Sequence, residues 1–234
     1  MSGINYYLLS ALPGLGEPGS TPPITRQELY KMVSASPAAA RLLEALFLGD
    51  DLLQRQALLA GQDSQPEPLL LTPSQIRGEQ PLPDFLTIPS SDSPRRIPED
   101  QIWNAYYHWA AQQAKQAGSR FLARWIAQEV ALRNTLVLAR AKALELEPSE
   151  YLVADELADP DADFTALLNE WGLAKNPLQG ERLLDDYRWR WLKDHESWFR
   201  FTDDELLAYA AQLMLLERWH RLNKAEAQEQ SVQK

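Results

Sequence analysis

The longest run of helical periodicity in the chain lies between Ser119 and Pro148, where neither glycine nor proline interrupts the sequence. Gly118 ends the preceding segment and Ser119 is a favourable N-cap, so we predict one helix of about 28 residues, roughly 40 Å long. At 100° per residue its apolar residues share one broad arc, which predicts the side that faces the core. They are Leu122, Trp125, Ile126, Val130, Leu132, Leu136, Val137 and Leu144, with Arg124, Gln128, Thr135 and Lys142 opposite.

Three charged residues, Glu129, Arg133 and Arg140, fall inside this apolar arc. Glu129 precedes Arg133 by four residues, which is the favourable order for an ion pair on one helix, whereas Arg140 needs a partner from another element. Two interpretations stay open. We favour an ion-pair network that fixes the register of packed helices, and the alternative is a catalytic acid with an arginine clamp.

The composition limits the classes of function. A chain of 234 residues with 45% hydrophobic content can bury one sizeable core, with or without an extension. Its net charge of −10 and its lack of a Lys/Arg-rich run argue against nucleic acid as a partner. The absence of cysteine excludes disulfides and thiolate chemistry, and no stretch reads as a signal peptide or membrane span. We therefore expect a cytoplasmic protein whose partner is another protein.

Local signals predict further helices on both sides of the long one. Thr25 and Glu28 form a capping box, and Ser36 with Pro37 begins a helix that runs to Gly61. Within it, the run 49–51 of one glycine and two aspartates predicts a bend or a close neighbour, and we expect both acids to be solvated. Other helices are predicted at 99–117, 178–199 and 203–222, while the apolar segment 5–13 is left open between strand and helix.

The segment from 62 to 98 is rich in proline but still carries leucines, so we expect it to pack on the body along an extended path. We predict an all-α fold: a multi-helix bundle of long antiparallel helices with an N-terminal helical hairpin and a proline-rich connecting segment. The predicted division is 1–61 for the N-terminal segment and hairpin, 62–98 for the connector, 99–222 for the main bundle and 223–234 for a frayed tail.

Two kinds of metal site can be tested against the spacing of ligands. Glu217 and His220 form one Glu-x-x-His, but a di-iron bundle needs two such helices and two further glutamates, which the sequence does not offer. The acidic stretch 159–170 has carboxylates at calcium-loop positions, yet Pro160 stiffens its start and Phe164 occupies the position that needs glycine. We predict helix capping by an aspartate there, no cofactor, no metal and no catalytic residue; the di-iron enzyme is kept as the alternative.

Four stretches together resemble a bacterial family whose members are encoded beside the subunits of V/A-type ATPases. They are the opening Asn5-Tyr6-Tyr7-Leu8 through Leu12-Pro13; Glu129 through Leu132-Arg133-Asn134 with Arg140-Ala141; Asn176-Pro177 with Asp185, Arg188 and Trp189; and Leu207-Ala208-Tyr209 through Glu217-Arg218-Trp219. Members of this family look like shortened relatives of that enzyme's C-type socket protein, whose eukaryotic counterpart is the d-type protein.

The resemblance implies a non-catalytic, all-helical socket that couples the central stalk to the membrane rotor ring from the cytoplasmic side. The implied partners are therefore central-stalk subunits and the rotor ring, with a free-standing helical scaffold as a further alternative. A socket that transmits torque must be stiff, so we predict a buried, mutually paired network of charged residues. Its predicted members are Glu129, Arg133, Arg140, Asp185, Arg188 and Glu217.

Overall fold

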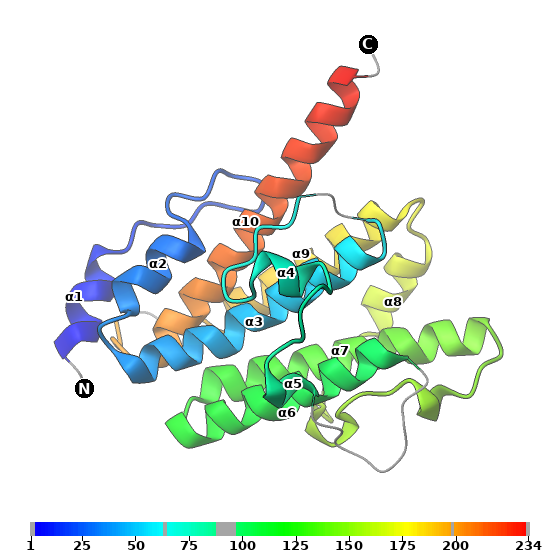
Figure 1. Ribbon diagram of the computed structural model, residues 1–234, viewed down its shortest axis with the longest axis horizontal. Coiled ribbons are helices and arrows are strands. Elements are labelled where there is room, and N and C mark those ends of the chain that lie inside the picture. The colour runs from blue at the N-terminus through cyan, green and yellow to red at the C-terminus, as the bar shows by residue number, and fades with distance from the viewer. Residues whose placement is uncertain (1–2, 63–64, 88–96, 198, 233–234) are drawn as a thin grey trace. The chain divides into compact units, whose positions relative to one another are not determined.

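The computed structural model describes residues 3–62, 65–87, 97–197 and 199–232 (Figure 1). These residues form ten α-helices and two short 3-10 helices, and the described part of the chain contains no strand. The predicted all-α, multi-helix fold is therefore confirmed. None of the described helices combines the length and the hydropathy that a membrane crossing requires.

The chain divides into two compact units. Unit 1 joins the two ends of the chain, Met1–Leu43 and Ala174–Lys234, and unit 2 is the continuous segment Glu44–Leu173. This division differs from the predicted one: α6 (Pro98–Ala117) and α7 (Arg120–Ala143) belong to unit 2, whereas α9 (Pro177–His195) and α10 (Asp203–Val232) belong to unit 1. One boundary falls inside α3 (Pro37–Leu59).

Unit 1 is built around its last helix, α10, which packs against α1 (Gly3–Ala11), α2 (Arg26–Val33) and α9. The opening segment, left open by the sequence, is thus a helix. Thr25 makes the predicted capping box with Glu28, and the Asn176 side chain caps α9. α10 is buried almost all round between Leu206 and Leu216, and it continues past its predicted end at 222.

Unit 2 contains the remainder of α3 and the pair of long antiparallel helices α6 and α7, which lie side by side (Figure 1). Gly118 joins them in the left-handed conformation, φ 67°, and Ser119 caps α7, so the predicted tight turn is present. The shorter elements of this unit are α4 (Pro73–Ile76), α5 (Asp84–Thr87), η1 (Pro148–Glu150), η2 (Asp155–Leu157) and α8 (Thr165–Gly172).

The proline-rich connector packs on unit 2 as expected, but two aspartates predicted to lie in solvent hold it there. Asp50 and Asp51 are only 4% and 0% exposed. The Asp51 carboxylate accepts the backbone N–H groups of residues 69, 70 and 71 at 2.6–3.1 Å, and Asp50 accepts from the Gln54 side chain at 2.6 Å. These carboxylates replace water for a stretch of backbone that has no helix or sheet partner. The described part of the connector also buries Leu71, Ile76, Leu82 and Leu86.

Gly49 permits a close approach, as the sequence suggested. A Cβ at this position would lie 2.5 Å from the Tyr106 hydroxyl of α6, which donates to the Ala45 carbonyl at 3.0 Å. Burial raises the pKa of Tyr106 well above its usual value of 10.0, so the phenol keeps the proton that this bond needs. The glycine therefore lets α6 pack closely on α3, and α3 runs unbroken through it.

Candidate functional site

The charged residues predicted to form one network occur in separate clusters. In unit 1, Glu217 of α10 accepts the Arg26 backbone N–H at 2.7 Å and also pairs with the Arg26 Nε. The Arg26 and Glu217 side chains are only 4% and 15% exposed. Because the carboxylate takes both the first backbone donor and the side chain of α2, it ties the start of that helix to α10.

A second cluster in unit 1 surrounds Asp185 of α9, which is 1% exposed. Arg188 of the same helix donates to it at 2.9 Å and Arg218 of α10 at 3.3 Å, and Arg218 also reaches Glu181 at 2.6 Å. Two of the predicted residues, Asp185 and Arg188, are therefore together. Arg218 and Arg26 were missing from the predicted network, although both are partners of its members.

A strained loop precedes α10. Phe199 and Phe201 adopt positive φ values of 62° and 54°, and Phe199 is 82% exposed although its spacing predicted a packed residue. The Glu205 carboxylate accepts the backbone N–H groups of residues 199, 200 and 201 at 2.7–3.0 Å. These three bonds hold the loop in a backbone conformation that bulky residues avoid.

In unit 2, Arg133 of α7 pairs with Asp100 in the first turn of α6 at 2.9 Å, with its guanidinium 4.9 Å from the centre of the Trp103 ring. The Trp103 indole N–H donates to Gln56 of α3 at 3.0 Å, so the chain of contacts joins three helices. The sequence placed Arg133 correctly inside the fold, but it named Glu129 as its partner. Glu129 lies half-buried on the same helix.

Asn134, next to Arg133, holds the loop that follows α7. Its amide donates to the Val153 carbonyl and accepts from the Val153 N–H, both at 3.0 Å, while Asn104 accepts from the Ala154 N–H at 2.9 Å. Ala154 has a positive φ of 45°. Two buried asparagines thus fix a tight loop against α6 and α7, a role that no spacing in the sequence indicated.

The outer end of α7 departs from the predicted burial. Arg140 is exposed: its guanidinium lies over the Trp171 ring of α8 at 5.2 Å, and no described carboxylate forms an ion pair with it. Leu144 is 67% exposed, and Gln128, predicted on the polar side, is only 4% exposed. The apolar arc is therefore right for the first turns of α7 and wrong for the last.

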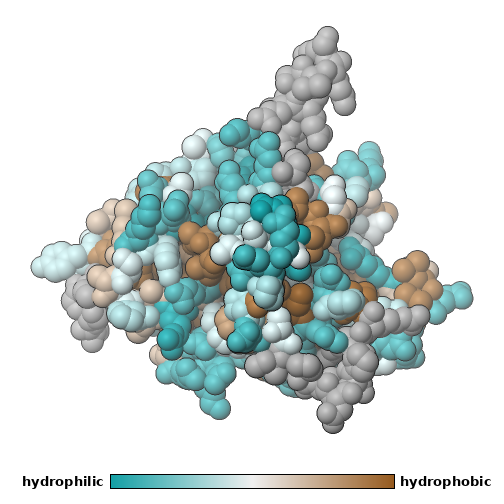
Figure 2. Space-filling model, in the orientation of Figure 1, coloured by the Kyte–Doolittle hydropathy of each residue, from teal (hydrophilic) through white to brown (hydrophobic). Residues whose placement is uncertain are grey.

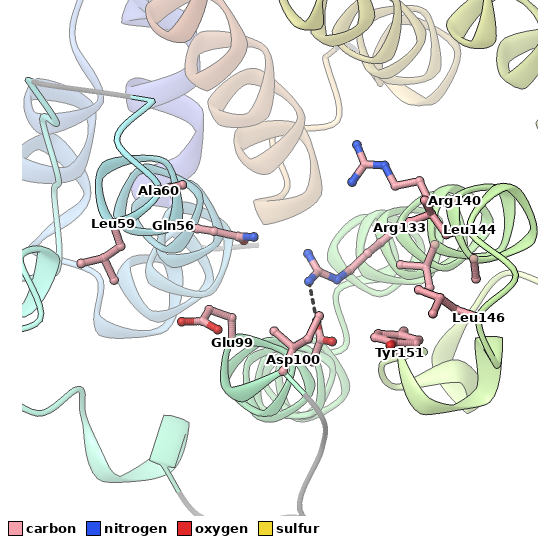
Figure 3. A pocket seen from close by; sticks show the side chains of 13 residues that line it. Gln56, Leu59, Ala60, Glu99, Asp100, Arg133, Arg140, Leu144, Leu146 and Tyr151 are labelled. Atoms are coloured by element: carbon pink, nitrogen blue, oxygen red, sulfur yellow. Dashed lines mark hydrogen bonds and ion pairs between the residues drawn. The ribbon is translucent and has the colours of Figure 1, made fainter.

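Arg133 and Arg140 both line a pocket of about 480 Å³ within unit 2 (Figure 3). In the close-up, Arg133, Asp100 and Gln56 point toward the middle of the pocket, and Leu144, Leu146 and Tyr151 form one side of it. Its volume is typical of ligand sites, and its walls combine aliphatic residues with a few polar groups. The lining comes from the end of α3, the start of α6, the end of α7 and the segment after it: Gln56, Leu59, Ala60, Ile97, Glu99, Asp100, Arg133, Val137, Arg140, Ala141, Leu144, Leu146 and Tyr151.

The surface around such a pocket sets a background for its apolar rim. On the face drawn in Figure 2 hydrophilic residues predominate, and hydrophobic ones form small groups between them. Ten large hydrophobic side chains are exposed in the part of the chain that the structure describes. Four of these ten, Leu59, Ile97, Leu144 and Leu146, line the pocket.

The residues of the metal alternatives have other surroundings. Glu217 bonds to Arg26, and His220 is exposed. Asp163 accepts the Thr165 backbone N–H at 2.9 Å at the start of α8, which is the capping role predicted in place of calcium binding. Within the described ranges no group of three or more His, Asp or Glu residues is arranged to hold a metal ion.

Comparison with known proteins gives one match. No curated protein and no solved structure matches the chain. Residues 79–232 match the family described as a protein of unknown function, DUF2764, and this span takes in most of unit 2 as well as α9 and α10. The matched span covers more than half of the sequence, so the chain belongs to the DUF2764 family.

Proposed function

We propose that this protein is a non-catalytic adaptor of a V/A-type ATPase, acting as a socket between the central stalk and the membrane rotor ring. The proposal begins from the resemblance of its four stretches to shortened relatives of the C-type socket protein. The family match adds no activity, so the assignment depends on the resemblance and on what the resembling residues do in the fold.

The single observation that carries the proposal is that the most polar of these residues connect helices and loops. Glu217 ties α2 to α10, Asp185 ties α9 to α10, and Arg133 ties α7 to α6. Asn134 fixes the loop after α7. Charged and amide groups used in this way resist sliding between helices, because breaking one pair strands a buried charge. Such stiffness suits a part that transmits torque, and these side chains are committed to internal contacts.

The test is affinity purification of the tagged protein from its native cell, using membranes solubilised in mild detergent. We expect central-stalk and rotor-ring subunits to co-purify in a fixed ratio and to be absent from an untagged strain. The Arg26→Met, Glu217→Leu double variant is a useful control, because it removes a structural pair that lies almost wholly inside unit 1. Reproducible absence of the ATPase subunits would refute the adaptor function and leave a free-standing helical scaffold.

A further inference from the structure

The pocket of unit 2 has a rim that water solvates poorly. Leu59, Ile97, Leu144 and Leu146 are between 38% and 67% exposed, and they come from three separate parts of the chain that converge on one hollow. Scattered exposed leucines need no explanation, but a convergent apolar rim is typical of an interaction site.

The two arginines of the pocket differ in how their charge is balanced. They are seven residues apart on α7 and therefore share a face of that helix. Arg133 pairs with the buried Asp100, although its Nε is buried without a hydrogen-bond acceptor. Arg140 is exposed and forms no ion pair with a described carboxylate. Glu99 lies on the α3 side of the pocket, away from Arg140 (Figure 3). The α7 side consequently presents a positive charge beside an apolar surface.

The wall that carries the two most C-terminal leucines is a defined structure. The Leu146 N–H bonds back to the Ala141 carbonyl at 2.9 Å, which closes α7 with a Schellman turn. Glu145 occupies the left-handed position of this turn with φ 55°, where glycine is usual. The turn therefore holds Leu144 and Leu146 in place on the pocket side although both are exposed.

We propose that this pocket docks an apolar segment of another protein, and that a carboxylate of that segment pairs with Arg140. A small molecule that fills a pocket of this size is normally enclosed by it, whereas Leu144 projects outward and only a larger body covers it. The positive charge of Arg140 is the argument for an acidic residue in the partner. For the partner's identity this inference rests on the proposed adaptor function, and for its chemistry it rests on the pocket alone.

The experiment places the photo-crosslinking residue benzoylphenylalanine at position 144 of the full-length protein in its native cell. Position 138 is the matched control, because Leu138 is also an exposed residue of α7, 44% accessible, but does not line the pocket. Each labelled protein is compared in three backgrounds: wild type, Arg140→Glu and Arg140→Lys. Both Arg140 variants change an exposed side chain, so their melting temperatures should match the wild type, and this is checked first.

The expected result is a protein adduct at position 144 and not at 138, with the crosslinked peptide apolar and containing Asp or Glu. Arg140→Glu should lower the yield by about tenfold or more, and Arg140→Lys should keep most of it. An adduct with those properties to a protein other than an ATPase subunit supports the docking site and contradicts the adaptor function. No adduct at 144, a lipid or small-molecule adduct, or a yield that ignores Arg140→Glu overturns the docking site, whether or not the ATPase co-purifies.

Discussion

Replacing Asp51 by alanine should cost much more stability than an ordinary surface substitution. The variant leaves three consecutive backbone N–H groups, those of Leu69, Leu70 and Leu71, without their acceptor. Leu71 is buried, so its amide loses the full desolvation compensation, about 1–3 kcal/mol, while the two half-buried amides lose about 0.5–1.5 kcal/mol each. Part of the sum returns because a desolvated charge is also removed. We expect a net loss of about 2–5 kcal/mol.

The assay is urea denaturation followed by far-ultraviolet circular dichroism, combined with hydrogen exchange of the 69–71 amides. The exchange measurement matters because the connector can detach locally without unfolding the helices. The matched control is Asp84→Ala, an exposed aspartate in the first turn of α5, which should change the free energy of unfolding by less than about 0.5 kcal/mol. Unchanged protection of the Leu71 amide in Asp51→Ala would refute the role given to this carboxylate.

The same residue predicts a pH dependence. Burial raises the pKa of Asp51 above its ordinary 3.8, although hydrogen bonds from the three amides oppose the shift. The folded protein therefore holds this proton to higher pH than the unfolded chain. The stability it contributes is complete below pH 3.8 and is lost as the pH rises through the folded-state value. The free energy of unfolding of wild type relative to Asp51→Asn should fall as the pH rises from about 3 to 7, and a rising difference would contradict the direction of the shift.

Three further variants test the charge clusters and the strained loop. Arg133→Ala should lower the free energy of unfolding by about 3 kcal/mol, because Asp100 stays buried without its partner, and a thermal melt like that of wild type would count against the pair. Glu217→Leu should cost about 3–5 kcal/mol by stranding Arg26, and adding Arg26→Met should recover most of it in urea titrations. Phe199→Gly should raise the free energy of unfolding by about 1 kcal/mol, since it relieves a positive φ and removes little packing; a destabilised variant would show that the ring is needed.

The parts of the fold that could be predicted from sequence are those with local causes. Thr25, Pro37, Ser119 and Asn176 mark the starts of helices because their capping chemistry involves neighbours within four residues. The same reasoning located the turn at Gly118. It could not locate the two units, since the boundary inside α3 depends on contacts between residues far apart in the sequence.

The acidic and basic residues show where such reasoning stops. The partners of Asp51 are backbone amides 18 to 20 residues away, and backbone donors leave no mark in a sequence. Periodicity correctly placed Arg133 and Glu217 near the core, but their acceptor and donor, Asp100 and Arg26, lie 33 and 191 residues away. For Arg140 the arc predicted burial, yet this last part of the helix is largely exposed, and the side chain lies over an aromatic ring of α8.

The discontinuity of unit 1 bears on synthesis at the ribosome. Unit 2 is an unbroken stretch of chain, so all of its contacts are possible once residue 173 has emerged from the exit tunnel. α1 and α2 emerge much earlier, but α10, the helix they pack on, is translated last. Until then the nascent α2 holds Arg26 without Glu217, and its apolar face is available to chaperones. Translation therefore builds the middle of this protein first and leaves its two ends to fold together after release.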